Sequence, residues 1–185
     1  LANADVANAD DAACFDPLST TFHSSAIIAL DVCARKPLIA SVAKDHRLKI
    51  WDYRSKRCEV SRTFREPPIC VALHPSGLYV LVVFPAQVKL LALLEGEASD
   101  VASLNATSAS FCSFARGGHA FCLVNKAVVT IYDTVSCEPT YSLRAASRVA
   151  SVVWERGDAR LATVGRYGSC ATWVLHTEQR DGEAE

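Results

Sequence analysis

The chain has 185 residues, of which 50% are hydrophobic and 21% are charged, and its formal net charge is −1. This balance is typical of a globular domain with a sizeable core and excludes an intrinsically disordered chain. A charge so close to zero gives no overall attraction to nucleic acid or to acidic lipid, so we expect neither as a partner. The sequence contains no Met, even at position 1, which predicts an excerpt of a longer protein.

The amino-terminal stretch predicts little packed structure. The tetrapeptide ANAD occurs twice within residues 1–11, which are acidic and have few large apolar side chains. We expect residues 1–11 to form a linker and residues 14–22 to supply the outer strand of a preceding unit. The opening residues do not resemble a secretory signal, and the apolar run 78–94 is too interrupted by polar residues to cross a membrane. We therefore expect no membrane partner.

From residue 23 onward the sequence repeats with a period of 40 or 41 residues. One marker is an aromatic residue or Leu inside a short apolar run, and it occurs at Trp51, Leu91, Tyr132 and Trp173. The second marker is a polar turn, which occurs as ARKP (34–37), HPSG (74–77), ARGG (115–118) and ERGD (155–158). Two independent markers with nearly the same period indicate a structural repeat.

Each repeat contains three short apolar runs separated by polar turns. In the first repeat these runs are residues 27–33, 37–43 and 48–53, which are rich in β-branched and aromatic residues and too short for helices. A looser fourth strand is expected at 57–64 and at 140–145. Three firm strands and one loose strand per 40 residues are typical of a β-propeller blade.

The sequence therefore predicts an all-β propeller with about four blades of a larger, seven-bladed ring. We expect the blade region to span residues 12–178 and to be followed by an exit loop or linker at 179–185. The expected blades are residues 23–64, 66–98, 108–145 and 147–178.

The first repeat contains a set of polar residues around its strands, namely His23, Ser41, Asp45 and Trp51. In order and spacing they resemble the buried hydrogen-bonded tetrad of WD-repeat blades, and Trp51-Asp52 matches the dipeptide that names this family. The resemblance implies a structural tetrad that fixes one edge of the blade. In the second repeat, Phe84 and Pro85 stand in the turn in place of polar tetrad residues.

The fourth repeat retains only part of the tetrad chemistry. It keeps Thr163 and Trp173, but it has Tyr167 near the place of the Asp.

Longer stretches resemble the axonemal WD-repeat proteins of cilia and flagella. The resembling segments, in chain order, are residues 31–53, 72–84, 111–134 and 151–175. This resemblance implies a structural role in the cytoskeleton of the motile ciliary or flagellar axoneme, near the inner dynein arms and the adjacent regulatory complex. It also implies axonemal proteins as partners, with tubulin among the candidates, and flanking blades and a coiled coil in the same or another chain.

The sequence gives no support for catalysis. It has no GxSxG, HExxH or GxxxxGK motif, and its five His residues are dispersed. We expect no catalytic, cofactor or metal site. The eight Cys residues form no CxxC pair, and Cys33, Cys70, Cys112, Cys122 and Cys170 lie in apolar runs. We expect these to be reduced core residues, with a disulfide between neighbouring strands as the alternative.

The candidate partner-binding residues are basic and fall in the turns of the first repeat. They are Arg35, Lys36, Lys44, Arg47, Arg54, Lys56 and Arg57. Such clusters bind acidic partners when a rigid scaffold presents them, although solvated turns have the same composition. A second hypothesis starts from Arg54, because Asp45, Trp51, Asp52 and Arg54 resemble the box by which some WD-repeat substrate receptors dock on cullin-type ubiquitin ligase adaptors.

Overall fold

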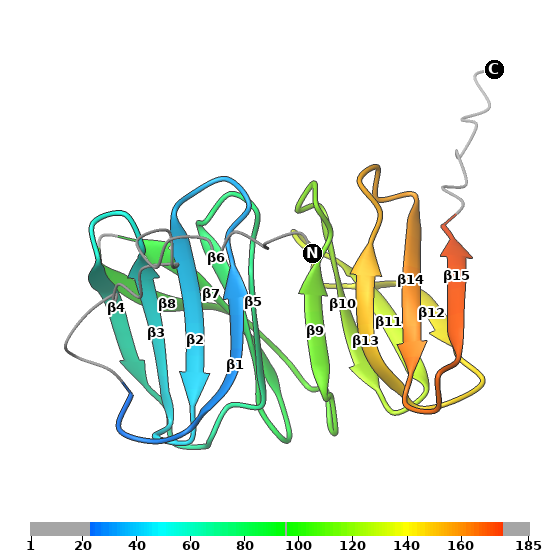
Figure 1. Ribbon diagram of the computed structural model, residues 1–185, viewed down its shortest axis with the longest axis horizontal. Coiled ribbons are helices and arrows are strands. Elements are labelled where there is room, and N and C mark those ends of the chain that lie inside the picture. Colours follow the sequence, from blue (N-terminus) through cyan, green and yellow to red (C-terminus); the bar gives the residue numbers. More distant parts are fainter. Residues whose placement is uncertain (1–22, 95, 176–185) are drawn as a thin grey trace, which may run out of the picture.

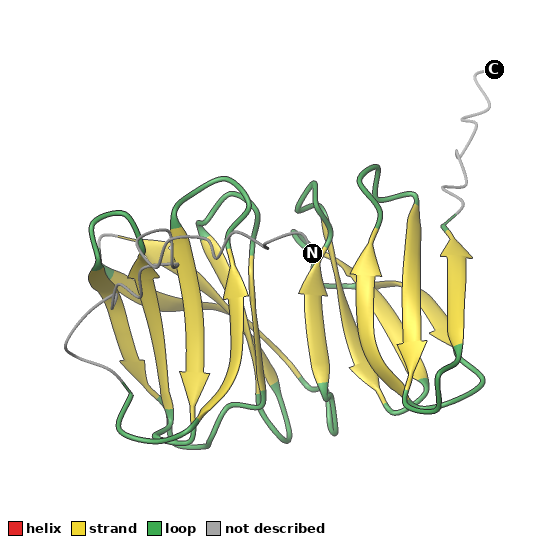
Figure 2. Ribbon diagram, in the orientation of Figure 1, coloured by secondary structure: helices red, strands yellow, loops and turns green. Residues whose placement is uncertain are grey.

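The computed structural model describes residues 23–94 and 96–175, and in these ranges the chain consists of strands and turns without a helix (Figures 1 and 2). Blade one contains β1 (Ile27–Val32), β2 (Leu38–Ala43), β3 (Arg47–Asp52) and β4 (Arg57–Thr63). Blade two contains β5 (Cys70–Leu73), β6 (Tyr79–Val83), β7 (Val88–Leu94) and β8 (Glu97–Leu104). Blade three contains β9 (Phe111–Phe114), β10 (Ala120–Asn125), β11 (Val128–Asp133) and β12 (Pro139–Arg144). Blade four contains β13 (Val149–Trp154), β14 (Arg160–Gly165) and β15 (Cys170–Val174).

In every blade each strand pairs antiparallel with its sequence neighbour, which confirms the predicted all-β fold of four consecutive sheets. The linkers expected at 1–11 and 179–185 and the strand expected at 14–22 lie outside the described residues. Blade two extends beyond the expected end at residue 98, because β8 continues to Leu104. This strand is largely exposed and mixes charged with small residues, so it lacks the apolar run that revealed the inner strands.

The third strands carry the repeat markers at equivalent places, as predicted. A β-bulge lies immediately before Trp51, Leu91 and Tyr132, in β3, β7 and β11 respectively. Trp173 pairs with Leu161 of β14 in the way that Trp51 pairs with Ile39 of β2. In blades one to three the 40-residue period therefore follows one recurring β-bulge.

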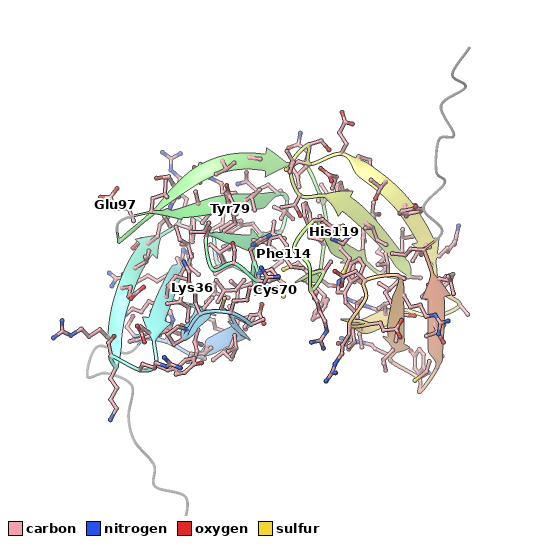
Figure 3. The ribbon with its side chains drawn as sticks, turned by 90° about the horizontal axis from the view of Figure 1, so that it is seen from above. Lys36, Cys70, Tyr79, Glu97, Phe114 and His119 are labelled. Atoms are coloured by element: carbon pink, nitrogen blue, oxygen red, sulfur yellow. The ribbon has the colours of Figure 1, made fainter. Side chains whose placement is uncertain are left out.

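The four sheets stack side by side in an arc, with blades one and four at its two ends (Figure 3). The innermost strand of each blade lies against the innermost strand of the next, in the order β1, β5, β9, β13. A separate apolar cluster fills each of the three junctions. Because the strands between these clusters are covered on both faces, their sequences are nearly continuous apolar runs.

The turns that carry the second repeat marker lie together on one rim, at the top of Figure 1. We call this row of turns, residues 34–37, 74–77, 115–118 and 155–158, the upper rim. Hydrogen bonds link the rim from blade to blade. The Cys33 thiol donates to the Pro75 carbonyl at 3.3 Å, and His74 Nε2 lies 3.0 Å from the Gly118 carbonyl oxygen.

The Asp158 carboxylate makes the third rim link, because it accepts from the backbone N–H groups of Arg116 and Gly117 at 2.8 and 2.6 Å. The repeated turn thus connects successive blades.

All seven described cysteines are free thiols, so the disulfide alternative is wrong for this part of the chain. Cys33, Cys70, Cys112 and Cys122 are buried, as expected for core thiols. The prediction for Cys170 is wrong, because this residue is exposed in β15 of blade four.

One face of blade four exposes Val153, Val164 and Val174 to solvent. The strand register puts these side chains on the same face, because Val153 pairs with Ala162 and Val174 pairs with Arg160. Exposed apolar faces of this kind drive association. We expect the 185-residue chain to self-associate, so that its weight-average mass in sedimentation velocity rises with concentration. Combining Val153→Lys with Val164→Lys should reduce that rise, whereas Val135→Lys in an exposed turn should not.

A chain that stays monomeric at every concentration would contradict this prediction.

Candidate functional site

The four polar residues predicted as a tetrad meet in blade one. His23 lies ahead of β1, Ser41 in β2, Asp45 in the β2–β3 turn and Trp51 in β3. His23 Nδ1 lies 2.9 Å from Asp45 Oδ2, and His23 Nε2 lies 2.8 Å from Ser41 Oγ. Trp51 Nε1 donates to Ser41 Oγ at 2.8 Å. One proton assignment satisfies every group: Nδ1–H donates to Asp45, and the Ser41 hydroxyl donates to Nε2.

Asp45 is the centre of this network. It also accepts from the backbone N–H groups of Ser24 and Arg47, each at 3.0 Å, and its side chain is 5% exposed. Desolvation alone raises the pKa of Asp45, but the hydrogen bonds from His23, Ser24 and Arg47 outweigh it and lower the pKa below its usual value. The carboxylate therefore stays ionised and fixes the entry to β1 against the β2–β3 turn.

The Asp45–His23–Ser41 order is that of a hydrolytic triad, but the site cannot work as one. A nucleophilic serine must reach the carbonyl carbon of a substrate. Ser41 is 2% exposed, and its oxygen already accepts the Trp51 indole N–H. The buried hydrogen bonds instead join the entry to β1 with β2, the β2–β3 turn and β3.

The corresponding positions in the other blades show how the tetrad chemistry varies. In blade four Trp173 Nε1 donates to Thr163 Oγ1 at 3.0 Å, which preserves the hydroxyl–indole pair. In blade two Leu81 and Leu91 occupy the same two positions and are fully buried. Tyr167, near the place of the Asp in blade four, is exposed. Only blade one combines the whole set among the described residues.

All seven candidate partner-binding residues are exposed in blade one. The β1–β2 and β3–β4 turns lie at the same end of the blade, whereas the β2–β3 turn lies at the opposite end. The structure therefore brings one basic group together at the upper rim, consisting of Arg35, Lys36, Arg54, Lys56 and Arg57. It leaves Lys44 and Arg47 at the opposite end, beside Asp45.

The backbone of Arg54 is held by Asp52, whose Oδ1 accepts from the N–H groups of Arg54 and Ser55 at 2.7 and 3.1 Å. This cap fixes the β3–β4 turn and holds the exposed Arg54 side chain at the rim.

Sequence reasoning missed three groups that join blades. Asp158 caps the turn of blade three, as described above. Asp31 accepts from the Leu73 N–H at 2.7 Å, and burial raises the pKa of this carboxyl. Arg62 and Lys89 share Asp100 between blades one and two, at 2.9 and 3.3 Å. Except for the Lys89–Asp100 pair within blade two, these contacts depend on how neighbouring blades face one another, which no local pattern reports.

Within residues 23–94 and 96–175, no three His, Cys, Asp or Glu side chains are close enough to share a metal ion. No helix in the described part of the chain is long and apolar enough to cross a membrane.

The antiparallel blades, the bulge shared by blades one to three and the buried His23–Ser41–Asp45–Trp51 set define a WD-repeat β-propeller chain. The chain is homologous to cilia- and flagella-associated protein 57 of Mus musculus, with 36% identity over 174 residues. It is 31% identical over 168 residues to cilia- and flagella-associated protein 57 A of Tetrahymena thermophila. These matches cover 94% and 90% of this chain but only 14% and 13% of the two relatives.

Two other comparisons bear on the fold. No family model matches the chain. A chain of the hydrazine synthase of Kuenenia stuttgartiensis superposes with a TM-score of 0.65 at 12% identity, covering 80% of this chain and 45% of that one. Identity this low shows a shared fold alone.

Proposed function

We propose that the chain is a non-enzymatic structural scaffold of the motile ciliary axoneme, within the cytoplasmic cytoskeleton, and that it forms part of a larger, seven-bladed ring. The observation that carries this proposal is the homology to ciliary proteins of a mouse and a ciliate, which spans nearly the whole chain. A propeller fold alone would not favour it, because propellers serve many unrelated functions. The burial of the Ser41 hydroxyl supports a structural rather than a catalytic role for the tetrad.

In its finer form, the proposal is that the protein helps to position inner dynein arms and the neighbouring regulatory complex on doublet microtubules. The basic group at the upper rim of blade one is the contact surface for an acidic axonemal partner, with tubulin as a candidate. Its cations project from turns on a rigid sheet, which is the usual way in which a scaffold presents binding residues.

The test uses the full-length ciliary protein in cells that lack their own copy. Changing Arg35, Lys36, Arg54, Lys56 and Arg57 to Ser should release the protein from demembranated axonemes at a lower salt concentration, because exposed ionic contacts are screened by salt. Arg54→Ala alone should change retention little, because one exposed charge adds little to a multivalent attachment. The matched control replaces five exposed arginines on and beside blade four by Ser, namely Arg144, Arg148, Arg156, Arg160 and Arg166.

A soluble protein whose binding to a cullin-type ligase adaptor disappears with Arg54→Ala would overturn the scaffold proposal. Equal salt release in the blade-one and blade-four variants would instead reject the basic group as the contact surface.

A further inference from the structure

At the end of blade four opposite the upper rim, two serine hydroxyls from different segments meet. Ser147 lies in the connection between β12 and β13, and Ser169 lies in the turn between β14 and β15 (Figure 1). Their Oγ atoms are 2.6 Å apart, and either hydroxyl can donate. Gly165 is buried beside them, and a Cβ at that position would collide with both oxygens. The backbone therefore makes room for this serine pair by omitting a side chain.

Each serine of the pair follows an arginine by three residues, which is the Arg-x-x-Ser motif that arginine-directed protein kinases phosphorylate. The described residues contain four Arg-x-x-Ser or Arg-x-x-Thr sequences, with Arg144 before Ser147, Arg148 before Ser151, Arg160 before Thr163 and Arg166 before Ser169. The motif alone does not distinguish these four hydroxyls, but their places in the fold differ.

Three of the four hydroxyl residues are held in the sheet of blade four. Thr163 is 3% exposed in β14. Ser151 pairs with Val164 in the ladder of β13 and β14. The Ser169 carbonyl accepts the Gly165 N–H at 2.7 Å and closes the β14–β15 hairpin. Because a protein kinase binds its substrate as an extended segment, each of these residues could be reached only by opening the sheet.

Ser147 is the exception, because it is partly exposed in a connection between two blades. The connection, residues 145–148, is hydrogen-bonded to the β10–β11 turn at its two ends, by the N–H groups of Ala145 and Val149, each at 2.8 Å. Residues 146–148 belong to no strand, so they can move away from the blade without separating a strand pair.

The surroundings of Ser147 are basic. Arg148 is its neighbour in the chain, and the Arg166 N–H donates to the Arg148 carbonyl at 3.0 Å. The Lys126 carbonyl accepts from the Val149 N–H, so a third exposed cation lies at the same end of the junction. The segments that carry these cations, residues 126–127, 145–148 and 166–169, contain no Asp or Glu. A phosphate on Ser147, with a charge of about −1.5 to −2 at pH 7, would therefore meet guanidinium groups without a competing carboxylate in these segments.

We propose that Ser147 is phosphorylated by an arginine-directed serine kinase and that Arg148 and Arg166 bind the phosphate. Arg144 is the residue that the kinase recognises, three positions before the serine. In the transfer, Ser147 Oγ forms a bond to the γ-phosphorus of ATP, the bond from that phosphorus to ADP breaks, and the hydroxyl proton passes to the catalytic base of the kinase. The phosphate then ties the connection that leaves blade three to the β14–β15 turn of blade four. The proposal does not depend on the axonemal role, because it rests only on this junction.

The first test measures phosphate transfer to the folded chain by calcium/calmodulin-dependent protein kinase II with ATP, and maps the sites by mass spectrometry. Phosphate should appear at Ser147. Arg144→Gln should slow its addition at least about tenfold, because a charge-assisted contact with the kinase is lost. Ser147→Ala should remove it, whereas Ser142→Ala in the exposed part of β12 should not.

A synthetic peptide of residues 142–172 is the unfolded reference for this test. Because no sheet protects its side chains, the peptide should also take phosphate at Ser151, Thr163 and Ser169. The folded chain should take it at Ser147 alone, so the comparison separates the selection made by the fold from the selection made by the motif.

The second test asks whether the phosphate is bound, by a pH titration followed with ³¹P NMR. The second pKa of phosphoserine is ordinarily about 6. Neighbouring guanidinium groups favour the dianion, so the phosphate on Ser147 should titrate at a pH about 0.5 lower in the folded chain than in the peptide. Arg166→Gln should return the pKa toward that of the peptide without slowing phosphorylation, because Arg166 lies outside the motif of Ser147. Arg156→Gln, at the upper rim of the same blade, is the matched control and should leave the pKa unchanged.

Two results would overturn the proposal. One is a folded chain that takes phosphate at Ser169, Ser151 or Thr163 as fast as at Ser147, or takes none at Ser147 although the peptide does. The other is a phosphate on Ser147 that titrates at the same pH in the folded chain and in the peptide, because the arginines would then not bind it.

Discussion

Replacing Gly118 by alanine is expected to lower the free energy of unfolding by about 3 kcal/mol, through backbone strain and a steric clash. Gly118 has φ +84°, which costs about 1 kcal/mol for a residue with a Cβ. The added methyl group would also overlap the His74 imidazole. This imidazole is hydrogen-bonded to the Gly118 carbonyl across the junction of blades two and three. Relieving the overlap must break that link, so both blades lose support.

The chain offers two matched glycines as controls. Gly168 has φ +78° with open space around its Cβ position, so Gly168→Ala tests the backbone strain alone. Gly157 has neither a positive φ nor a neighbour within 4 Å, so Gly157→Ala should be nearly neutral. In urea unfolding, Gly118→Ala should be the least stable of the three variants, Gly168→Ala should be intermediate, and Gly157→Ala should be close to the unsubstituted protein. If Gly118→Ala and Gly168→Ala lose equal stability, the contact between Gly118 and His74 does not exist.

The second large effect is expected for Asp45→Ala, which should lower the free energy of unfolding by about 1 to 3 kcal/mol. The substitution leaves His23 Nδ1 and the N–H groups of Ser24 and Arg47 without their acceptor. Because His23 and Asp45 are almost fully buried, water does not replace the lost bonds. Asp52→Ala is the control in the same blade, since Asp52 caps only the exposed β3–β4 turn.

The effect of Asp45→Ala should depend on pH in a defined direction. The folded protein lowers the pKa of Asp45, so the ionised carboxylate contributes stability that is fully present above its unfolded pKa of about 3.9. That contribution is lost as the pH falls through the lower folded pKa. The melting temperatures of the unsubstituted protein and of the Asp45→Ala variant should therefore differ at neutral pH and become equal on strong acidification. Melting curves that coincide at pH 7 would show that the tetrad adds no stability.

The sequence predicts the inner strands well because burial on both faces imposes an apolar pattern on them. Strands β2 and β3 begin and end within a residue of the predicted runs at 37–43 and 48–53. The outer strand β8 was not predicted, because its residues are largely exposed and need not be apolar. The tetrad of blade one could be predicted because its four residues resemble, in order and spacing, the tetrad of WD-repeat blades.

The links between blades could not be predicted in the same way. His74 and Asp158 bond to residues about one repeat away, and those bonds depend on the angle at which two sheets meet. Periodicity detects the turns that carry these residues. It does not show which atoms of successive turns meet, because that depends on the tertiary packing of each junction.

The upper rim has a consequence for the order of the blades. Blade one offers a thiol to the Pro75 carbonyl, blade two offers an imidazole to the Gly118 carbonyl, and blade four offers a carboxylate to two amides of blade three. Each interface thus has its own donor and acceptor, although the units share one topology. A blade inserted out of turn would meet a mismatched neighbour. The rim interactions therefore favour the native order of the blades over misordered packing among units that share one topology.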